Sequence, residues 1–236
     1  LGGGGGCSFL LNQSMESNLA RKVTEINTVW CITRSKFKQI NLFAYNLDNA
    51  QTIYSWHMFT CGYWADICRA RAESRTSGFA EYGRLMKYYL ENPNVITGTI
   101  WAINNKDDHI GDWDEPISEK YKVCDKEKIY MFWLAKWPYL VTEFLEVAKT
   151  TIGEESGYAY LNKAEYSQGK WKGKGKERLA EYCKSLRNGE MVKRDASELS
   201  EMWEMRIEFE KPENVMIDGE IHSTQKVQGS SSGKMG

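Results

Sequence analysis

Three short segments of the chain carry residue types suited to binding phosphate, a hydroxyl group or a divalent cation. The first is the glycine run that follows Leu1, in which successive backbone N–H groups can converge on an anion. A helix predicted over residues 14–30 would add its positive N-terminal end. A flexible linker explains the same composition, so both interpretations stay open. The candidate phosphate ligands in this run are Gly3, Gly4, Gly5 and Gly6.

The second segment is Cys61-Gly62-Tyr63-Trp64-Ala65-Asp66, which precedes an arginine-rich stretch. A carboxylate at Asp66 can bind a hydroxyl or ammonium group. Arg69, Arg71 and Arg75 can neutralise phosphates, because a guanidinium presents forked donors that match phosphate oxygens. The alternative is structural: Asp66 caps a helix and the arginines form a solvated face.

The third segment is Asp218-Gly219-Glu220, which follows a predicted strand. Paired carboxylates around a glycine can hold Mg²⁺ directly or through water, as phosphoryl transfer requires. Asp-Gly is also a common hairpin sequence, so an ordinary turn is the alternative.

The elements that must position these segments are mostly strands. A hairpin is predicted from the strands 40–45 and 52–59, with turn chemistry at 46–50. Apolar residues alternate with charged ones over 203–209, which is typical of a half-buried antiparallel strand. The remaining predicted elements are a helix over 70–90, strands over 95–103, 129–135, 157–161 and 215–217, a short helix over 177–186 and a turn at 211–214. The pattern predicts a mainly β, α+β fold built as an antiparallel β-sandwich-like sheet.

Composition narrows the class of partner. The chain has 31 basic and 32 acidic side chains among 236 residues, so no overall field favours nucleic acid. No apolar stretch approaches the roughly 18 residues that span a bilayer, and a cytoplasmic protein is the expectation. The six cysteines form no CxxC pair. The nearest metal-ligand spacing, in His57, Cys61 and Cys68, lacks a fourth ligand, so buried thiols are the better interpretation.

A lysine-rich segment over 170–176 surrounds Trp171. Lysines and an indole suit an anionic membrane surface, where each cation contributes about 1 kcal/mol. The segment predicts peripheral membrane association, with a solvated loop as the alternative.

The order and spacing of these segments resemble the C-terminal part of the diacylglycerol-kinase-like lipid kinases, and within that group the sphingosine kinases most closely. Residues 62–66 are similar to the family's Gly-Phe-x-Ala-Asp segment, and residues 75–78 to its Arg-x-x-Gly pattern. Residues 114–118 resemble its Glu-Pro-Val-Pro stretch. Residues 206–212 and 215–220 resemble its Phe-Arg-Leu-Glu-Pro and Val-Asp-Gly-Glu strands.

The resemblance implies an ATP-dependent kinase that phosphorylates the primary hydroxyl of a sphingoid base or related lipid, with ATP and Mg²⁺ as cofactors. It implies that Asp66 contacts the lipid head group, and that Asp218 and Glu220 organise Mg²⁺. The nucleotide would be bound by Gly3–Gly6, Arg75, Gly219 and Glu220. The catalytic base would belong to a Gly-Gly-Asp-Gly motif upstream of Leu1, so no catalytic base is assigned in this chain. Asp66 and the acidic turn at 218–220 are expected to share one cleft.

On this basis residues 1–38 are predicted to be a remnant of a nucleotide-binding domain, 39–228 a lipid-binding β-rich domain and 229–236 a disordered tail. Four positions depart from the family pattern, and one of them is Cys68, which occupies a position that is often acidic in sphingosine kinases. Gly5 and Cys7 replace side chains that would contact the nucleotide, and Glu81 stands where a second arginine would face phosphate. These departures suit a non-catalytic lipid- or ligand-binding β-domain, and an aromatic-rich structural interaction module is a third interpretation.

Overall fold

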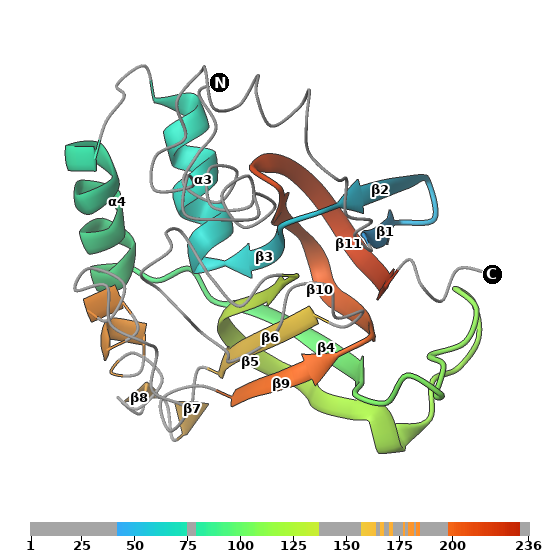
Figure 1. Cartoon of the computed structure of the whole chain (residues 1–236). Coiled ribbons are helices and arrows are strands. Elements are labelled where there is room, and N and C mark those ends of the chain that lie inside the picture. Colours follow the sequence, from blue (N-terminus) through green and yellow to red (C-terminus); the bar gives the residue numbers. More distant parts are fainter. Residues whose placement is uncertain are drawn as a thin grey trace, which may run out of the picture.

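The computed structural model describes residues 42–74, 79–136, 157–163, 166–167, 170–171, 177, 179–181, 183–184 and 198–231. The predicted helix over 14–30 and the predicted nucleotide-binding remnant therefore lie outside the described residues, as do most of the lysine-rich segment and parts of the predicted helix over 177–186. Figure 1 shows a strongly curved sheet with two helices beside it.

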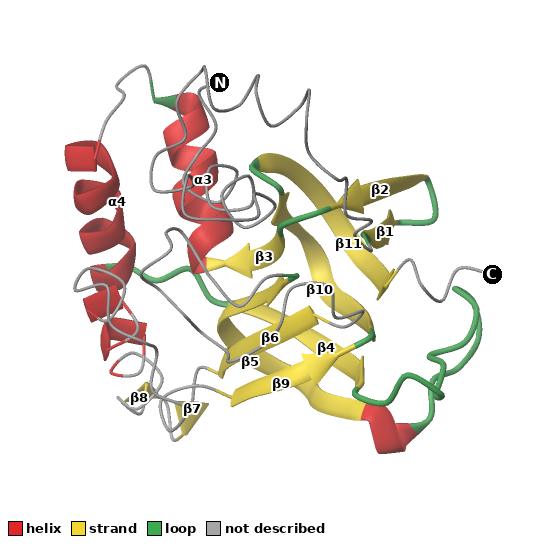
Figure 2. Cartoon of the chain, viewed as in Figure 1, coloured by secondary structure: helices red, strands yellow, loops and turns green. Residues whose placement is uncertain are grey.

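The described part of the chain is mainly antiparallel β structure with few helices, as predicted (Figure 2). The strands are β1 (Phe43–Leu47), β2 (Gln51–Ser55), β3 (Met58–Gly62), β4 (Ile96–Ile103), β5 (Lys122–Ala135), β6 (Gly157–Lys163), β7 (Tyr166–Ser167), β8 (Lys170–Trp171), β9 (Glu198–Met202), β10 (Glu204–Ile217) and β11 (Glu220–Ser231). The helices are α3 (Tyr63–Glu73), α4 (Phe79–Glu91) and the 3-10 turn η1 (Glu119–Tyr121).

Nine of the described strands form one sheet in the order β2-β1-β11-β10-β3-β5-β6-β9, with β4 pairing both β10 and β5. The predicted hairpin is confirmed as β1 and β2, in which Leu47 pairs with Gln51. Strand β11 runs to Ser231 and pairs with β1, so residues 229–231 belong to the sheet rather than to the predicted tail.

Strands β3 and β4 lie in line with one another between the two long strands β10 and β5. The ladder between β10 and β4 ends at Phe209 and Gly98, and the ladder between β10 and β3 begins at Val215 and Cys61. On the other side, β5 pairs first with β4 and then with β3. The chain leaves the sheet at the end of β3, forms α3 and α4, and returns at the start of β4. We call the place where β3 ends and β4 begins, beside residues 210–214 of β10, the sheet break.

Three predicted boundaries differ from the structure. The strand predicted over 52–59 is divided into β2 and β3, because the backbone turns at Trp56 and His57. The helix predicted over 70–90 is two helices, and α3 begins earlier, at Tyr63. The turn predicted at 211–214 is a bulge inside the continuous strand β10, where five steps along β10 from Glu208 to Glu213 match two steps along β11. Pro212 has no N–H to donate to a ladder, which favours an irregularity at this point.

Both faces of the sheet are buried around β5. One apolar cluster includes Phe132 and Leu134 of β5 with residues of β1, β4 and β10. The other includes Met131 and Trp133 with residues of α3 and α4. Side chains of successive strand residues point to opposite faces, so β5 contributes to both clusters in alternation.

Candidate functional site

The sheet break is where Asp66 lies, and Gly62 makes its position possible. Gly62 has a φ of 75°, a backbone conformation that residues with a side chain rarely adopt. A Cβ atom at this position would also collide with the carbonyl oxygen of Tyr130 on β5. A glycine therefore lets β3 turn directly into α3 while it stays against β5. The first turn of α3 then carries Asp66 inward, beside the buried Tyr63 and Ile67.

Asp66 is only 3% exposed, and its carboxyl Oδ2 atom has no hydrogen-bond partner in the described part of the chain. Burial raises the pKa of Asp66 above its ordinary value, and a hydrogen bond with Asn94 and the charge of Arg69 offset part of that rise. Asn94 stands just before β4, so the two strand ends at the sheet break both contribute to this environment. A buried carboxyl oxygen without a partner calls for an explanation, such as a catalytic role or a bound water, ion or ligand.

Glu213, on the β10 side of the sheet break, is a second buried acid and is 7% exposed. Desolvation raises the pKa of Glu213, the nearby charge of Lys211 lowers it, and the charge of Asp66 raises it further. Sequence reasoning missed Glu213 because Lys-Pro-Glu-Asn suggests an exposed turn. Pro212 is the residue that could have indicated the burial of Glu213. A proline inside an otherwise regular strand pattern indicates a bulge, and bulges often redirect side chains near functional sites.

Asp218 forms a different structure, a clamp at the other end of β3. Its carboxylate accepts hydrogen bonds from Ser55 Oγ at 2.8 Å and from the N–H groups of Trp56 at 3.0 Å, His57 at 3.2 Å and Met58 at 2.8 Å. Asp218 and Gly219 both have positive φ, as a tight two-residue hairpin turn requires. Four protein groups thus donate to the carboxylate that was predicted to organise Mg²⁺. Through these bonds Asp218 holds the β2–β3 corner against the β10–β11 turn.

The structure does not bring Asp66 and the acidic turn together. Asp218 bonds to Met58 at the start of β3, whereas Asp66 follows the end of the same strand. A strand of this length separates the two ends by about 13 Å. Asp66 and the acidic turn thus lie beyond opposite ends of β3, and the shared cleft stays a prediction. Glu220 is exposed beyond the clamp, and the N–H of Gly219 faces Met216 Sδ at 2.9 Å.

The other predicted ligands are placed as follows. Gly3, Gly4, Gly5, Gly6 and Arg75 lie outside the described residues, so their assignment to the nucleotide stays a prediction. Glu81 lies on α4 and binds Arg84 through two hydrogen bonds, of 2.6 and 2.9 Å. Arg84 lowers the pKa of Glu81 through these bonds and neutralises its charge. The predicted repulsion of phosphate by Glu81 is weakened accordingly.

The described residues contain no group of three or more His, Cys, Asp or Glu side chains arranged to hold a metal ion. Cys61 is a free, buried thiol that packs in the apolar cluster. The Asp218 carboxylate already accepts four hydrogen bonds, so this predicted Mg²⁺ ligand is committed to contacts within the protein. Within the same residues, no helix is long and apolar enough to cross a membrane.

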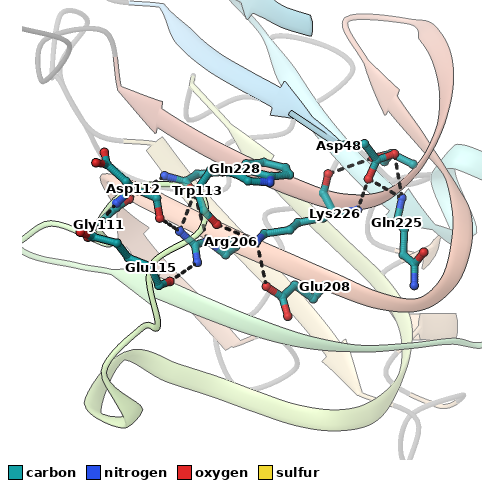
Figure 3. Close-up of polar contacts among 11 residues, drawn as sticks. Asp48, Gly111, Asp112, Trp113, Glu115, Arg206, Glu208, Gln225, Lys226 and Gln228 are labelled. Carbon is teal, nitrogen blue, oxygen red and sulfur yellow. Dashed lines mark hydrogen bonds and ion pairs between the residues drawn. The ribbon is translucent and has the colours of Figure 1, made fainter. Parts of the chain in front are cut away.

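A second polar arrangement lies at the far end of β10, where sequence reasoning predicted a solvated face (Figure 3). Arg206 and Glu204 are instead buried, at 2% and 5% exposure. Arg206 donates to the carbonyl oxygens of Asp112 (2.5 Å) and Glu115 (2.8 Å). Glu204 accepts a hydrogen bond from the N–H of Ile110 at 2.8 Å. We call these contacts the loop clamp, because they hold residues 109–115 over the sheet.

The loop clamp also shapes a surface groove. Gln228 binds Arg206 and the carbonyl oxygen of Gly111, and Lys226 Nζ donates to the carbonyl oxygen of Trp113 at 2.7 Å (Figure 3). Between this loop and the β1–β2 hairpin is a cavity of about 610 Å³ whose lining includes Asn46, Thr52, Trp113 and Gln228.

No protein-family model matches the chain, and no curated protein matches it. Among solved structures, a diacylglycerol kinase from Bacillus anthracis matches 97% of this chain and 61% of its own length, with 13% identity and a TM-score of 0.50. Two structures assigned as diacylglycerol kinases of the same organism match 86% and 97% of this chain, with identities of 12% and 13% and TM-scores of 0.53 and 0.55.

The chain spans about three fifths of the length of these structures, with shares of 61%, 57% and 64%. At such low identity the likeness establishes architecture alone. It agrees with the mainly β organisation and with the predicted resemblance to lipid kinases. The described part of the chain thus shares its architecture with these diacylglycerol kinase structures.

Proposed function

We propose that this chain is the lipid-binding part of an ATP-dependent lipid kinase that phosphorylates the primary hydroxyl of a sphingoid base or a related lipid. The observation that carries the proposal is the buried Asp66 carboxyl, which has an unpartnered oxygen at the sheet break. The fold shared with diacylglycerol kinases supports the reaction class.

In the proposed reaction Asp66 accepts a hydrogen bond from the lipid head group and orients it. A carboxylate is a strong acceptor, and a charge-assisted hydrogen bond in a buried site contributes more than one in water. The base that takes the hydroxyl proton is assigned to a segment other than the described residues.

ATP and Mg²⁺ would supply the transferred phosphoryl group and neutralise its charge. As predicted from the sequence, we propose that the nucleotide is bound by Gly3–Gly6, Arg75, Gly219 and Glu220. In this assignment Glu220 is the acid of the turn that would face the nucleotide, because it is exposed, whereas the Asp218 carboxylate is engaged by the protein. Glu220 lies beyond the opposite end of β3 from Asp66.

We propose a peripheral position at the cytoplasmic membrane surface, through the lysines of the 170–176 segment. Reversal of these charges is expected to weaken binding to anionic vesicles, and unchanged partitioning would count against this part of the proposal.

The proposal is tested by titrating the 236-residue chain with a short-chain sphingoid base and with a short-chain diacylglycerol. Asp66→Asn is expected to weaken binding of both by about tenfold or more, because the amide cannot replace a charge-assisted acceptor. Asp107→Asn, in an exposed loop, is the matched control and should bind as the wild type does. If neither lipid binds the wild type, or if Asp66→Asn binds both equally well, the proposal is wrong.

A non-catalytic lipid-binding domain is the second candidate, since the described acidic turn is committed to structure through Asp218. Nucleotide distinguishes the two. A kinase part should gain thermal stability from ATP with Mg²⁺, whereas a pure lipid-binding domain should respond to lipid alone.

A further inference from the structure

The sheet break holds two buried acids, and the strand register explains why they approach one another. Cys61 of β3 pairs with Val215 of β10, so Glu213 lies level with the point where β3 turns into α3. Helix α3 packs against both β3 and β10, and its first turn carries Asp66. Two side chains far apart in the sequence, at Asp66 and Glu213, thus converge from a helix and a strand.

The electrostatic environment agrees with this convergence. The charge of Asp66 raises the pKa of Glu213, and both acids add to the rise in the pKa of Cys61 that burial causes. Asp66 also adds to the rise in the pKa of Tyr89, which burial causes first. The titratable and charged groups around the pair are Cys61, Arg69, Tyr89 and Lys211.

Two cations neighbour the acids, Arg69 beside Asp66 and Lys211 beside Glu213. Arg69 directs Nη1 to Glu73 at 3.0 Å, and its Nε atom has no partner in the described residues. Lys211 Nζ is 3.6 Å from Glu213, but its side chain is 73% exposed. Two buried carboxyl groups near one another favour either a retained proton or a bound cation, because burial and mutual repulsion both penalise the charged forms.

We propose that Asp66 and Glu213 together bind a primary ammonium group, so that Glu213 makes the site selective for amino lipids over neutral lipids. The inference rests on the proposed function, in which Asp66 meets the lipid head group. An ammonium group has three N–H donors and can satisfy both carboxylates at once, whereas a hydroxyl group has one donor.

Lys211 has a defined place in this proposal. Its ammonium group already approaches Glu213 from the solvent side and competes with an external amine for the same carboxylate. Lys211→Met is therefore expected to tighten binding of an amino lipid by a few-fold. The same substitution should not tighten binding of a neutral lipid.

The test is a titration of the full chain with three probes: a short-chain 2-amino-1,3-diol, its N-acetyl derivative and a short-chain diacylglycerol. Glu213→Gln is expected to weaken binding of the amine by about 10- to 100-fold and to leave both neutral lipids within about twofold of the wild type. Glu210→Gln, an exposed acid on the same strand, is the matched control. Thermal unfolding of each variant verifies that it is folded.

Proton release gives an independent readout. Calorimetric titrations in buffers of different ionisation enthalpy count the protons released on binding. At a pH above the ordinary carboxyl pKa, the amine should displace protons from the Asp66–Glu213 pair of the wild type, and it should displace fewer protons from Glu213→Gln. Equal loss of all three probes in Glu213→Gln, or no loss of any, overturns the role of Glu213 while the proposed function stands. Absence of lipid binding by the wild type overturns both.

Discussion

Asp218 and Met58 are joined by two reciprocal hydrogen bonds, because the Met58 N–H donates to Asp218 Oδ1 at 2.8 Å and the Asp218 N–H donates to the Met58 carbonyl at 2.9 Å. This pairing closes the corner between β2 and β3 against the β10–β11 turn. It shows that an acidic Asp-Gly turn with the appearance of a metal ligand serves as a structural clamp. The consequence for stability can be measured.

Asp218→Asn is expected to lower the free energy of unfolding by about 1–3 kcal/mol, since an amide cannot accept all four hydrogen bonds. Asparagine tolerates the positive φ of this position, so the loss reports the carboxylate and not backbone strain. Urea unfolding measures the change. The exposed Glu220→Gln should shift the same free energy by less than about 0.5 kcal/mol, and an equal loss in the two variants would contradict the clamp.

Gly62 and Gly219 form a matched pair, because both have positive φ but only one is crowded. A Cβ at Gly62 meets the Tyr130 carbonyl, whereas a Cβ at Gly219 meets nothing within 4 Å. Gly219→Ala should therefore cost about 1–2 kcal/mol of backbone strain. Gly62→Ala should lower the free energy of unfolding by clearly more than Gly219→Ala does, and it should weaken the packing of α3 against the sheet. Denaturation curves in which Gly62→Ala is the milder change would show that the start of α3 is positioned differently.

The stability of the protein should depend on pH through Asp66. Burial raises its pKa above the ordinary value of 3.8, so the folded state holds more protons than the unfolded state in the window above that value. The contribution of Asp66 to stability is present at low pH and is lost as pH rises through the raised pKa. Asp66→Asn stays neutral and should gain stability relative to the wild type as pH rises. Urea unfolding from about pH 4 to about pH 7 measures this difference, and a constant difference would contradict it.

The loop clamp predicts a local effect. Arg206→Lys keeps the charge but loses the forked donors that reach the carbonyls of Asp112 and Glu115. Hydrogen exchange of the Ile110 amide, which bonds to Glu204, should accelerate by about tenfold or more while amides in β5 change little. Lys211→Arg on the same strand is the control, since Lys211 is exposed. Unchanged exchange in residues 109–115 would mean that the loop is held by other contacts.

Much of the fold was predictable because it depends on local chemistry. The β1–β2 hairpin follows from turn residues between two strand patterns, and β4 lies within one residue of the predicted strand. The sequence could not reveal that Arg206 and Glu204 are buried, because alternation with Met205 and Ile207 looks like a solvated face. Only the fold brings the 109–115 loop over that face.

The candidate site was predictable in part for the same reason. Asp66 was found from its place after a glycine at a strand end. Glu213 was missed because its burial depends on the bulge in β10 and on the junction of β3 with β4. Asp218 was predicted to organise a metal ion, but four donors that fill its carboxylate come from residues about 160 positions earlier in the chain.

The most direct test of the central claim is lipid binding by the chain with and without the Asp66 carboxylate. The wild type is expected to bind a short-chain sphingoid base, and Asp66→Asn is expected to lose this binding while it stays folded and becomes more stable at neutral pH. A stable Asp66→Asn variant that binds the lipid as tightly as the wild type would contradict the account.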